Sequence, residues 1–321
     1  MNPRSIPYEV KTPILLIVFR RADLVTLVLE ELRSVRPCKL YVAADGPRPG
    51  VATEPAECEA VRRAVVEGID WPCEVRLRFR DANLGVQDGV VDAINWVFST
   101  EEQAIILEDD ILPTVDFFRF CDELLDRYRA DPQVAAICGT SYLQGPSKVS
   151  YYASNCIDMW GWATWRDRWR GYDAQMSAWP SFDHSGRLAA MSGASPRFAR
   201  YWRNIFDRTL AGHMNTWDYQ WILTCWNKGQ VALHPKVPLV RNIGFDDRAS
   251  HTQVNRQPRY SRVPRRLSFP LHAPPTLQPD AASERAMWAF RFYISAWDAF
   301  LVPIKAKLGL LRRLIKMRLG K

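Results

Sequence analysis

Short apolar runs alternate with amphipathic stretches along the first 140 residues, and this alternation leaves few possible folds. The short runs predict buried strands, whereas apolar side chains at helical spacing predict amphipathic helices. Strands that alternate with helices form βαβ units with a mostly parallel sheet. The predicted strands are residues 14–19, 39–44, 75–79, 104–107 and 134–138, and the predicted helices are residues 22–35, 57–67, 86–98 and 114–128. The sequence thus predicts an α/β, Rossmann-like fold with helices flanking the sheet.

The composition agrees with a folded cytoplasmic protein. Of the 321 residues, 47% are hydrophobic, which is enough to bury a sizeable core. The seven cysteines are scattered and form no Cys-x-x-Cys pair. This argues against a disulfide framework or a zinc knuckle and fits a reducing cytosol. No run of 18 apolar residues is free of charge, and the N-terminus shows no secretory signal, so we expect no spanning helix.

Most of the net charge of +8 belongs to the C-terminal tail. Residues 299–321 carry seven basic and no acidic side chains, so the rest of the chain is near neutral and gives no indication of nucleic-acid binding. From Ile304 onward, apolar residues at helical spacing form one narrow face flanked by basic residues. This pattern predicts an interfacial helix on an anionic membrane, at the inner face of the plasma membrane. The alternative is an ordinary helix docked on the domain.

The chain divides into three predicted parts. Residues 1–252 form the main domain, with a first half at 12–140 and a second half at 141–252 that contains nine of the thirteen tryptophans. A basic, proline-rich linker follows at residues 253–282, and an amphipathic basic helical tail at residues 283–321.

Polar clusters follow the second, third and fourth predicted strands. They are Asp45 to Arg48, then Arg80, Asp81 and Asn83 to Gly85, and finally Glu108, Asp109 and Asp110. Parallel α/β sheets bind ligands at the carboxyl ends of their strands, so we expect these three clusters to meet at one edge.

The three consecutive carboxylates suggest a cation site. Carboxylates that follow a buried strand cost desolvation energy unless a cation meets them. Mg²⁺ and Mn²⁺ prefer oxygen ligands, and Mg²⁺ is often held by one or two carboxylates together with substrate phosphates. The alternative is a capping role, in which Asp110 or Thr114 begins the next helix near Pro113.

The order of these motifs resembles the GT-A class of nucleotide-sugar glycosyltransferases, and in particular N-acetylglucosaminyltransferase I and related bacterial nucleotide-diphospho-sugar transferases. The resemblance covers roughly residues 12–252, and it implies that residues 1–252 are the catalytic domain, with a nucleotide-binding half at 12–140 and an acceptor half at 141–252. The matching segments are residues 18–21, Asp45, residues 83–85, residues 108–110, the tryptophan-rich segment 160–165, residues 216–221, residues 242–245 and residues 250–252.

The resemblance implies roles for individual residues. Arg20 closes the first strand, Asp45 contacts the nucleoside, and Arg80 or Asp81 flanks the nucleotide near Asn83. Glu108 positions the ribose or metal waters, Asp109 faces the donor sugar and Asp110 binds Mn²⁺ or Mg²⁺. His251 is a second candidate for the metal. Trp160, Trp162 and Trp217 form an acceptor wall, although core packing is the alternative for these tryptophans.

The resemblance also implies the reaction, which is inverting transfer of a sugar from a nucleoside diphosphate donor, UDP-linked, to a glycan or lipid-linked acceptor in polysaccharide synthesis. Such a displacement needs a base that removes the acceptor proton. Asp218 is the candidate because its aromatic neighbours would raise its basicity. The runner-up base is Asp158, and the alternative for Asp218 is a place on a helix whose tryptophans are core.

Two other functions fit parts of the pattern. A sugar-phosphate nucleotidyltransferase would share the sheet and the metal, but it needs a glycine-rich loop after the first strand, and residues 20–24 contain no glycine. An NAD enzyme is disfavoured for the same reason, because no Gly-x-Gly-x-x-Gly opens the first helix. The second of these functions is a non-catalytic scaffold at the membrane, and Asp110 and Asp218 argue against it.

Overall fold

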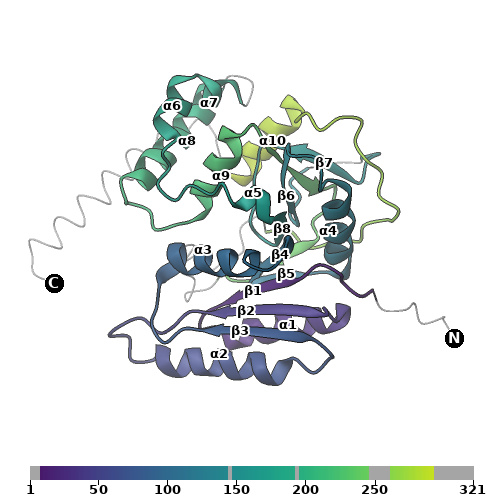
Figure 1. Cartoon of the computed structure of the whole chain (residues 1–321). Helices are drawn as coiled ribbons and strands as arrows, with labels where there is room; N and C mark the ends of the chain where they lie inside the picture. Colours follow the sequence, from purple (N-terminus) through teal and green to yellow (C-terminus); the bar gives the residue numbers. More distant parts are fainter. Residues whose placement is uncertain (1–7, 144–146, 192–194, 246–260, 293–321) are drawn as a thin grey trace, which may run out of the picture.

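The computed structural model describes residues 8–143, 147–191, 195–245 and 261–292, and within them an eight-stranded sheet is covered by helices on both faces (Figure 1). The predicted α/β fold with a mostly parallel sheet flanked by helices is confirmed. In sheet order the strands are β3 (Glu74–Phe79), β2 (Lys39–Ala44), β1 (Ile14–Val18), β4 (Gln103–Glu108), β8 (Trp162–Trp165), β6 (Val134–Cys138), β9 (Val231–Pro235) and β7 (Tyr151–Ser154).

Six of these strands run in one direction. The pairs β3–β2, β2–β1, β1–β4 and β6–β9 are parallel, whereas β8 and β7 run antiparallel to their neighbours. The five strands predicted from the sequence are all present. The second half of the chain adds β7, β8 and β9 to the same sheet, and β8 lies between β4 and β6. The predicted nucleotide and acceptor halves therefore share one sheet.

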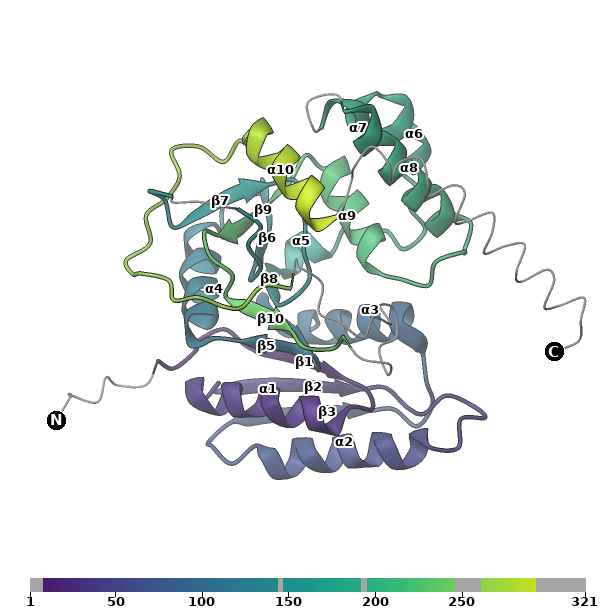
Figure 2. The same ribbon diagram turned by 180° about the vertical axis from the view of Figure 1, so that it is seen from behind.

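The two faces of the sheet form two cores. Along β1, the side chains of Ile14, Leu16 and Val18 pack with helices α1 (Ala22–Val35), α2 (Glu54–Gly68) and α4 (Val115–Arg127). Leu15 points to the other face, where α3 (Gly85–Phe98) and α9 (Asp218–Asn227) lie. In Figure 2, α1 and α2 cover one face of the part of the sheet formed by β1, β2 and β3, and α3 lies on the other face. This alternation follows from the period of two in a strand.

Most tryptophans of the second half build the core over α9. Trp162, Trp202, Trp221 and Trp226 are almost fully buried and stack on one another and on nearby aromatic rings. The short helices α5 (Arg166–Trp169), α6 (Trp179–His184) and α7 (Arg187–Ala190) and the longer α8 (Pro196–Leu210) cover this core.

The C-terminal part of the described chain is packed on the body. Residues 261–280 form an extended strap, in which Leu267 N donates to Asp116 at 2.9 Å and His272 N donates to Ser150 Oγ at 2.9 Å. Helix α10 (Ala281–Arg291) follows, and its Met287 and Trp288 are buried. The first turns of the predicted tail are thus part of the globular body, while residues 293–321 lie outside the described residues. None of the described helices is long and apolar enough to span a membrane.

A two-stranded ribbon closes the end of β4. Strand β5 (Ile111–Pro113) pairs antiparallel with β10 (Val240–Asn242), and Ile243 N donates to Asp110 O at 2.8 Å. The ribbon carries Gly244 to the carboxylates at the end of β4, where a Cβ on Gly244 would lie only 2.7 Å from Arg21 Nη1.

Replacing Trp288 tests whether α10 belongs to the core. Trp288 is 3% exposed and its ring lies 5.1 Å from that of Phe198. Trp288→Ala should lower the free energy of unfolding by about 3–5 kcal/mol, because it leaves a large cavity. Urea denaturation followed by circular dichroism measures this change. Leu210→Ala, at a half-exposed position on α8, is the control and should change stability little. An unchanged unfolding energy for Trp288→Ala would contradict the packing described here.

Candidate active site

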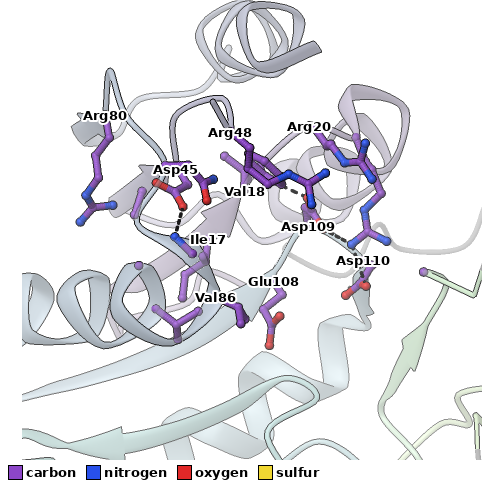
Figure 3. A pocket seen from close by; sticks show the side chains of 18 of the residues that line it. Ile17, Val18, Arg20, Asp45, Arg48, Arg80, Val86, Glu108, Asp109 and Asp110 are labelled. Carbon is purple, nitrogen blue, oxygen red and sulfur yellow. Dashed lines mark hydrogen bonds and ion pairs between the residues drawn. The ribbon is translucent and has the colours of Figure 1, made fainter. Parts of the chain in front are cut away.

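A cavity of about 530 Å³ opens at the carboxyl ends of β1, β2 and β4. This volume lies within the usual range for small-molecule sites. Eight of the predicted site residues line it: Arg20, Asp45, Arg80, Asn83, Glu108, Asp109, Asp110 and Trp160. The polar clusters that follow the second, third and fourth predicted strands therefore meet at one edge of the sheet. Figure 3 shows Arg20, Arg48 and the Asp109–Asp110 pair on one side, and Asp45 and Arg80 on the other.

Arg21 neutralises the carboxylates at the end of β4. Its Nη2 donates to Asp109 Oδ1 and, at 2.8 Å, to Asp110 Oδ2. Phe19 N also donates to Asp109 Oδ2 at 3.3 Å. Burial opposes the charge of the guanidinium, but Asp109 and Asp110 raise the pKa of Arg21 above its usual value. Asp109 and Asp110 therefore line the cavity as a pair bridged by one guanidinium, which offsets one of their two possible charges.

Glu108 is held in a mostly neutral state. Burial, and then the charges of Asp110, Asp109 and Asp218, raise the pKa of Glu108 to about 8. Burial also raises the pKa of Asp109 to about 6, although Arg21 acts in the opposite direction. Three adjacent carboxyl groups cannot all be charged here at low cost, so this cluster favours the arrival of positive charge.

Two further arginines line the cavity from loops. Arg48 Nε donates to Glu54 Oε1 at 2.8 Å, and Arg48 N donates to Glu54 Oε2 at 2.8 Å. Arg20 Nη1 lies 3.6 Å from the same Glu54 Oε1. The Glu54 side chain is fully buried, and the Arg48 hydrogen bond lowers its pKa. A buried carboxylate thus fixes two guanidinium groups at the cavity, as suits an anionic phosphate ligand.

The opposite wall is tied together by Asp45 and Asn83. The Asp45 carboxylate accepts from Leu84 N at 3.0 Å and from Gly85 N at 3.2 Å, and so caps the start of α3. Asn83 Nδ2 donates to Gly46 O at 2.8 Å. Gly46 is needed here, because a Cβ would lie 2.6 Å from the backbone of Ala82.

The remaining nucleotide candidates differ in position. Arg80 lines the cavity and forms an ion pair with Asp92. Asp81, by contrast, is exposed and does not line the cavity. Of the two residues proposed to flank the nucleotide, the structure therefore places only Arg80 at the cavity.

Asp218 approaches the carboxylate cluster from the second half of the chain. It begins α9 and accepts hydrogen bonds from Thr216 Oγ1 and, at 2.9 Å, from Tyr219 N. It does not line the cavity itself, but its charge contributes to the raised pKa of Glu108. The runner-up Asp158 is 4% exposed and accepts from Trp160 N at 3.0 Å and Arg291 Nε at 3.3 Å. Asp158 is therefore a structural anchor away from the cavity.

The predicted acceptor wall is mostly core. Trp160 lines the cavity, with the Phe245 ring 5.7 Å from its own. Trp162 and Trp217 are 1% and 5% exposed, and their rings stack with centroids 5.9 Å apart. The assignment of these two tryptophans to the acceptor is therefore corrected, since they are too deeply buried to contact a sugar. Period-two alternation along β8 explains this for Trp162, which points to the aromatic core.

The oxygen-only donor set fits Mn²⁺ or Mg²⁺ shared with a phosphate. Within the described part of the chain, no three His, Cys, Asp or Glu side chains are arranged around one ion position. Asp109 and Asp110 could supply one or two oxygens, so further ligands would come from a diphosphate and water, as Mg²⁺ often requires. The other predicted ligand, His251, lies outside the described residues.

Sequence reasoning assigned no individual role to several residues that line the cavity, although all of them except Asn215 belong to clusters or segments singled out above. They are Arg21, Arg48, Asn215, Asn242, Gly244 and Phe245. Two adjacent arginines directly after a buried strand were a detectable signal for Arg21 and matched the carboxylates after β4. The ribbon that brings Asn242, Gly244 and Phe245 to the cavity depends on a long-range pairing with β5, which no local pattern reveals.

The chain has no match among protein-family models or curated proteins. Its structure was compared with solved structures. HddC from Yersinia pseudotuberculosis aligns at 8% identity and a TM-score of 0.31, covering 48% of this chain and 77% of that one. UDP-glucose pyrophosphorylase complexed with UDP-glucose aligns at 10% identity and a TM-score of 0.26, covering 44% of this chain and 62% of that one. The inositol-1-phosphate CTP transferase from T. maritima aligns at 10% identity and a TM-score of 0.37, covering 70% of this chain and 86% of that one. The α/β assignment therefore rests on strand order and pairing.

Glu108→Gln should change how stability depends on pH. The pKa of Glu108 is raised from 4.5 to about 8 in the folded protein. Its charged form is therefore disfavoured by folding, and stability falls as pH rises from 4.5 towards 8. The variant removes this cost. Its gain in unfolding free energy should be absent below pH 4.5, grow by up to about 1.4 kcal/mol per pH unit between pH 4.5 and about 8, and stay constant above that.

Urea denaturation in EDTA across pH 4–9 measures this difference. Glu67→Gln, on an exposed position of α2, is the matched control and should show the wild-type pH dependence. Parallel curves for Glu108→Gln and the wild type would show that Glu108 ionises normally in the folded state.

Proposed function

We propose that the protein is a metal-dependent, inverting glycosyltransferase, which moves a sugar from a nucleoside diphosphate donor to a glycan or lipid-linked acceptor. The observation that carries the proposal is the cavity at the strand ends, where arginines, a carboxylate pair and the Asp45–Asn83 wall lie together. A nucleoside diphosphate sugar needs all of these features, because it joins a polar base and ribose to two phosphates and a sugar.

The two sides of the cavity suit different parts of such a donor. Asp45, Arg80 and Asn83 lie on the side that would hold the nucleoside. Arg20 and Arg48, fixed by Glu54, lie where phosphates would be bound by charge-assisted hydrogen bonds. Asp109 and Asp110 would hold Mn²⁺ or Mg²⁺, which when bound supplies positive charge to the leaving diphosphate.

Asp218 is the proposed general base. An inverting transfer breaks the bond between the anomeric carbon and the diphosphate while the acceptor oxygen forms a new one, and the acceptor proton passes to a carboxylate. Asp218 begins α9, and its charge acts on Glu108, which lines the cavity, so its proximity to the carboxylate cluster supports this assignment. Trp160 is the candidate for contact with a sugar ring.

A sugar-phosphate nucleotidyltransferase is the competing function. Such an enzyme would hold a nucleoside triphosphate with the loop after β1. Here the connection consists of Phe19, Arg20 and Arg21 alone, and α1 begins at Ala22. This short connection favours a diphosphate donor. An assay for nucleotide-sugar formation from a nucleoside triphosphate and a sugar 1-phosphate separates the two functions, and turnover there would contradict our proposal.

The setting of the reaction follows from the tail. We propose that the basic residues of segment 299–321 keep the enzyme on the anionic inner face of the plasma membrane, where polysaccharides are assembled on lipid carriers. The support for this is the sequence pattern of the tail.

Metal-linked nucleotide binding tests the proposed clamp. Calorimetry should show UDP binding to the wild type with Mn²⁺, and a loss of about tenfold or more, 1.4 kcal/mol, in EDTA. Asp110→Ala should show the same loss with Mn²⁺ present, because a ligand to the ion is missing. Asp126→Ala, at an exposed position on α4, is the matched control. Equal UDP affinity in all of these conditions would refute the clamp.

Asp218→Asn should separate binding from chemistry. A thermal-shift screen with Mn²⁺ first identifies a nucleotide sugar that binds, and release of UDP from it measures turnover. The variant should bind this donor like the wild type while turnover falls by about 10²–10⁴-fold, the usual contribution of a general base. Asp126→Asn should leave turnover unchanged. Wild-type turnover for Asp218→Asn would mean that another group takes the proton.

A further inference from the structure

Arg21 sits where a divalent ion would bind. Its Nη2 contacts both Asp109 Oδ1 and Asp110 Oδ2, the oxygens that carboxylates offer to a metal. The Gly244 backbone lies against both Asp110 and Arg21, so close that a side chain there would collide with Asp110 Oδ2 and Arg21 Nη1. An ion bound between these two carboxylates would meet the guanidinium, which carries the same sign of charge, at contact distance.

The Arg21 side chain is only partly satisfied in this position. Its Nη1 is buried and has no hydrogen-bond partner among the described residues, although the side chain as a whole is 13% exposed. Arg21 lines the cavity, next to Arg20 in the loop that follows β1. Arg48, by comparison, is fixed by several hydrogen bonds to Glu54. Arg21 therefore keeps an unused donor in the cavity where phosphates would arrive.

Asp109 does not depend on Arg21 alone for its orientation. Phe19 N donates to Asp109 Oδ2 at 3.3 Å, and the backbone of Asp110 is fixed by Ile243 N at 2.8 Å. The Asp109 carboxylate and the Asp110 main chain are thus each held by a backbone donor as well, and Arg21 adds positive charge to the pair.

We propose that Arg21 is an internal cation that competes with the divalent metal for the Asp109–Asp110 pair and is released to the diphosphate when metal and donor bind together. This inference rests on the proposed function, and it adds a coupling to it. Two like charges cannot share the pair at low cost. A guanidinium also matches the paired oxygens of a phosphate, so the diphosphate supplies a new partner for Arg21. Metal binding and nucleotide binding thereby become linked.

Removing the Arg21 charge should strengthen metal binding in the absence of nucleotide. Arg21→Met should bind Mn²⁺ about tenfold more tightly than the wild type, within the usual range for coupled ligands. Electron paramagnetic resonance of free Mn²⁺, titrated with the full chain, measures this directly. Addition of UDP should raise the Mn²⁺ affinity of the wild type more than that of Arg21→Met, because only the wild type has the competitor to release.

The controls separate charge from folding. Arg33→Met removes an arginine–aspartate pair, Arg33 Nε to Asp70 Oδ1 at 2.7 Å, on helix α1, which follows Arg21, and it should leave Mn²⁺ affinity unchanged. Arg21→Gln keeps a donor without the charge, and it replaces Arg21→Met if circular dichroism shows that the methionine variant is unfolded. Equal or weaker Mn²⁺ binding by the Arg21 variant would overturn the inference.

The proposed function fails in a different way. If UDP binds to the wild type equally well with Mn²⁺ and in EDTA, the metal clamp itself is wrong. If UDP binding is metal-linked but the Arg21 variant gains no Mn²⁺ affinity, the clamp stands and only the competition by Arg21 is refuted.

Discussion

Two adjacent carboxylates at the end of a buried strand must be compensated, and the rest of the site is arranged around that need. Arg21 meets Asp109 and Asp110 from the loop after β1, and the β5–β10 ribbon closes over Asp110 from the other end of the chain. Compensation by one arginine leaves Glu108 with a raised pKa of about 8. The cluster is therefore stable as it stands and still favours additional positive charge, which is the condition for a site that takes up a cation together with an anionic ligand.

The parts of the fold that follow from local pattern were predictable from the sequence. The alternation of apolar runs and amphipathic stretches predicted strands β1, β2, β3, β4 and β6 and the four helices α1 to α4. Each of these elements has a recognisable pattern within its own few residues. The rule that ligands bind at the carboxyl ends of parallel strands then brought Asp45, Asn83 and Asp110 to one cavity. Seven of the eight predicted site residues that line it do so for this reason, and the eighth, Trp160, precedes the antiparallel strand β8.

What depends on long-range pairing was not predictable in the same way. Because β8 lies between β4 and β6, the Trp162 side chain is buried in the core. The sequence of its segment is equally compatible with a sugar-binding wall. Trp288 belongs to the segment 283–321 that the sequence predicted as an amphipathic tail, yet α10 packs it against Phe198 and Trp202. The pairing of Arg21 with Asp109 spans 88 residues, so no pattern along the chain distinguishes Arg21 from its neighbour Arg20.

X-ray diffraction from crystals grown with UDP and Mn²⁺, recorded above the manganese absorption edge, tests the central claim most directly. We predict an anomalous peak beside the Asp110 carboxylate, shared with the diphosphate, with the uridine towards Asp45 and the Arg21 guanidinium moved from the carboxylate pair to a phosphate. A nucleotide bound elsewhere, or one bound in this cavity with Arg21 still bridging Asp109 and Asp110 and no manganese beside them, would contradict the account.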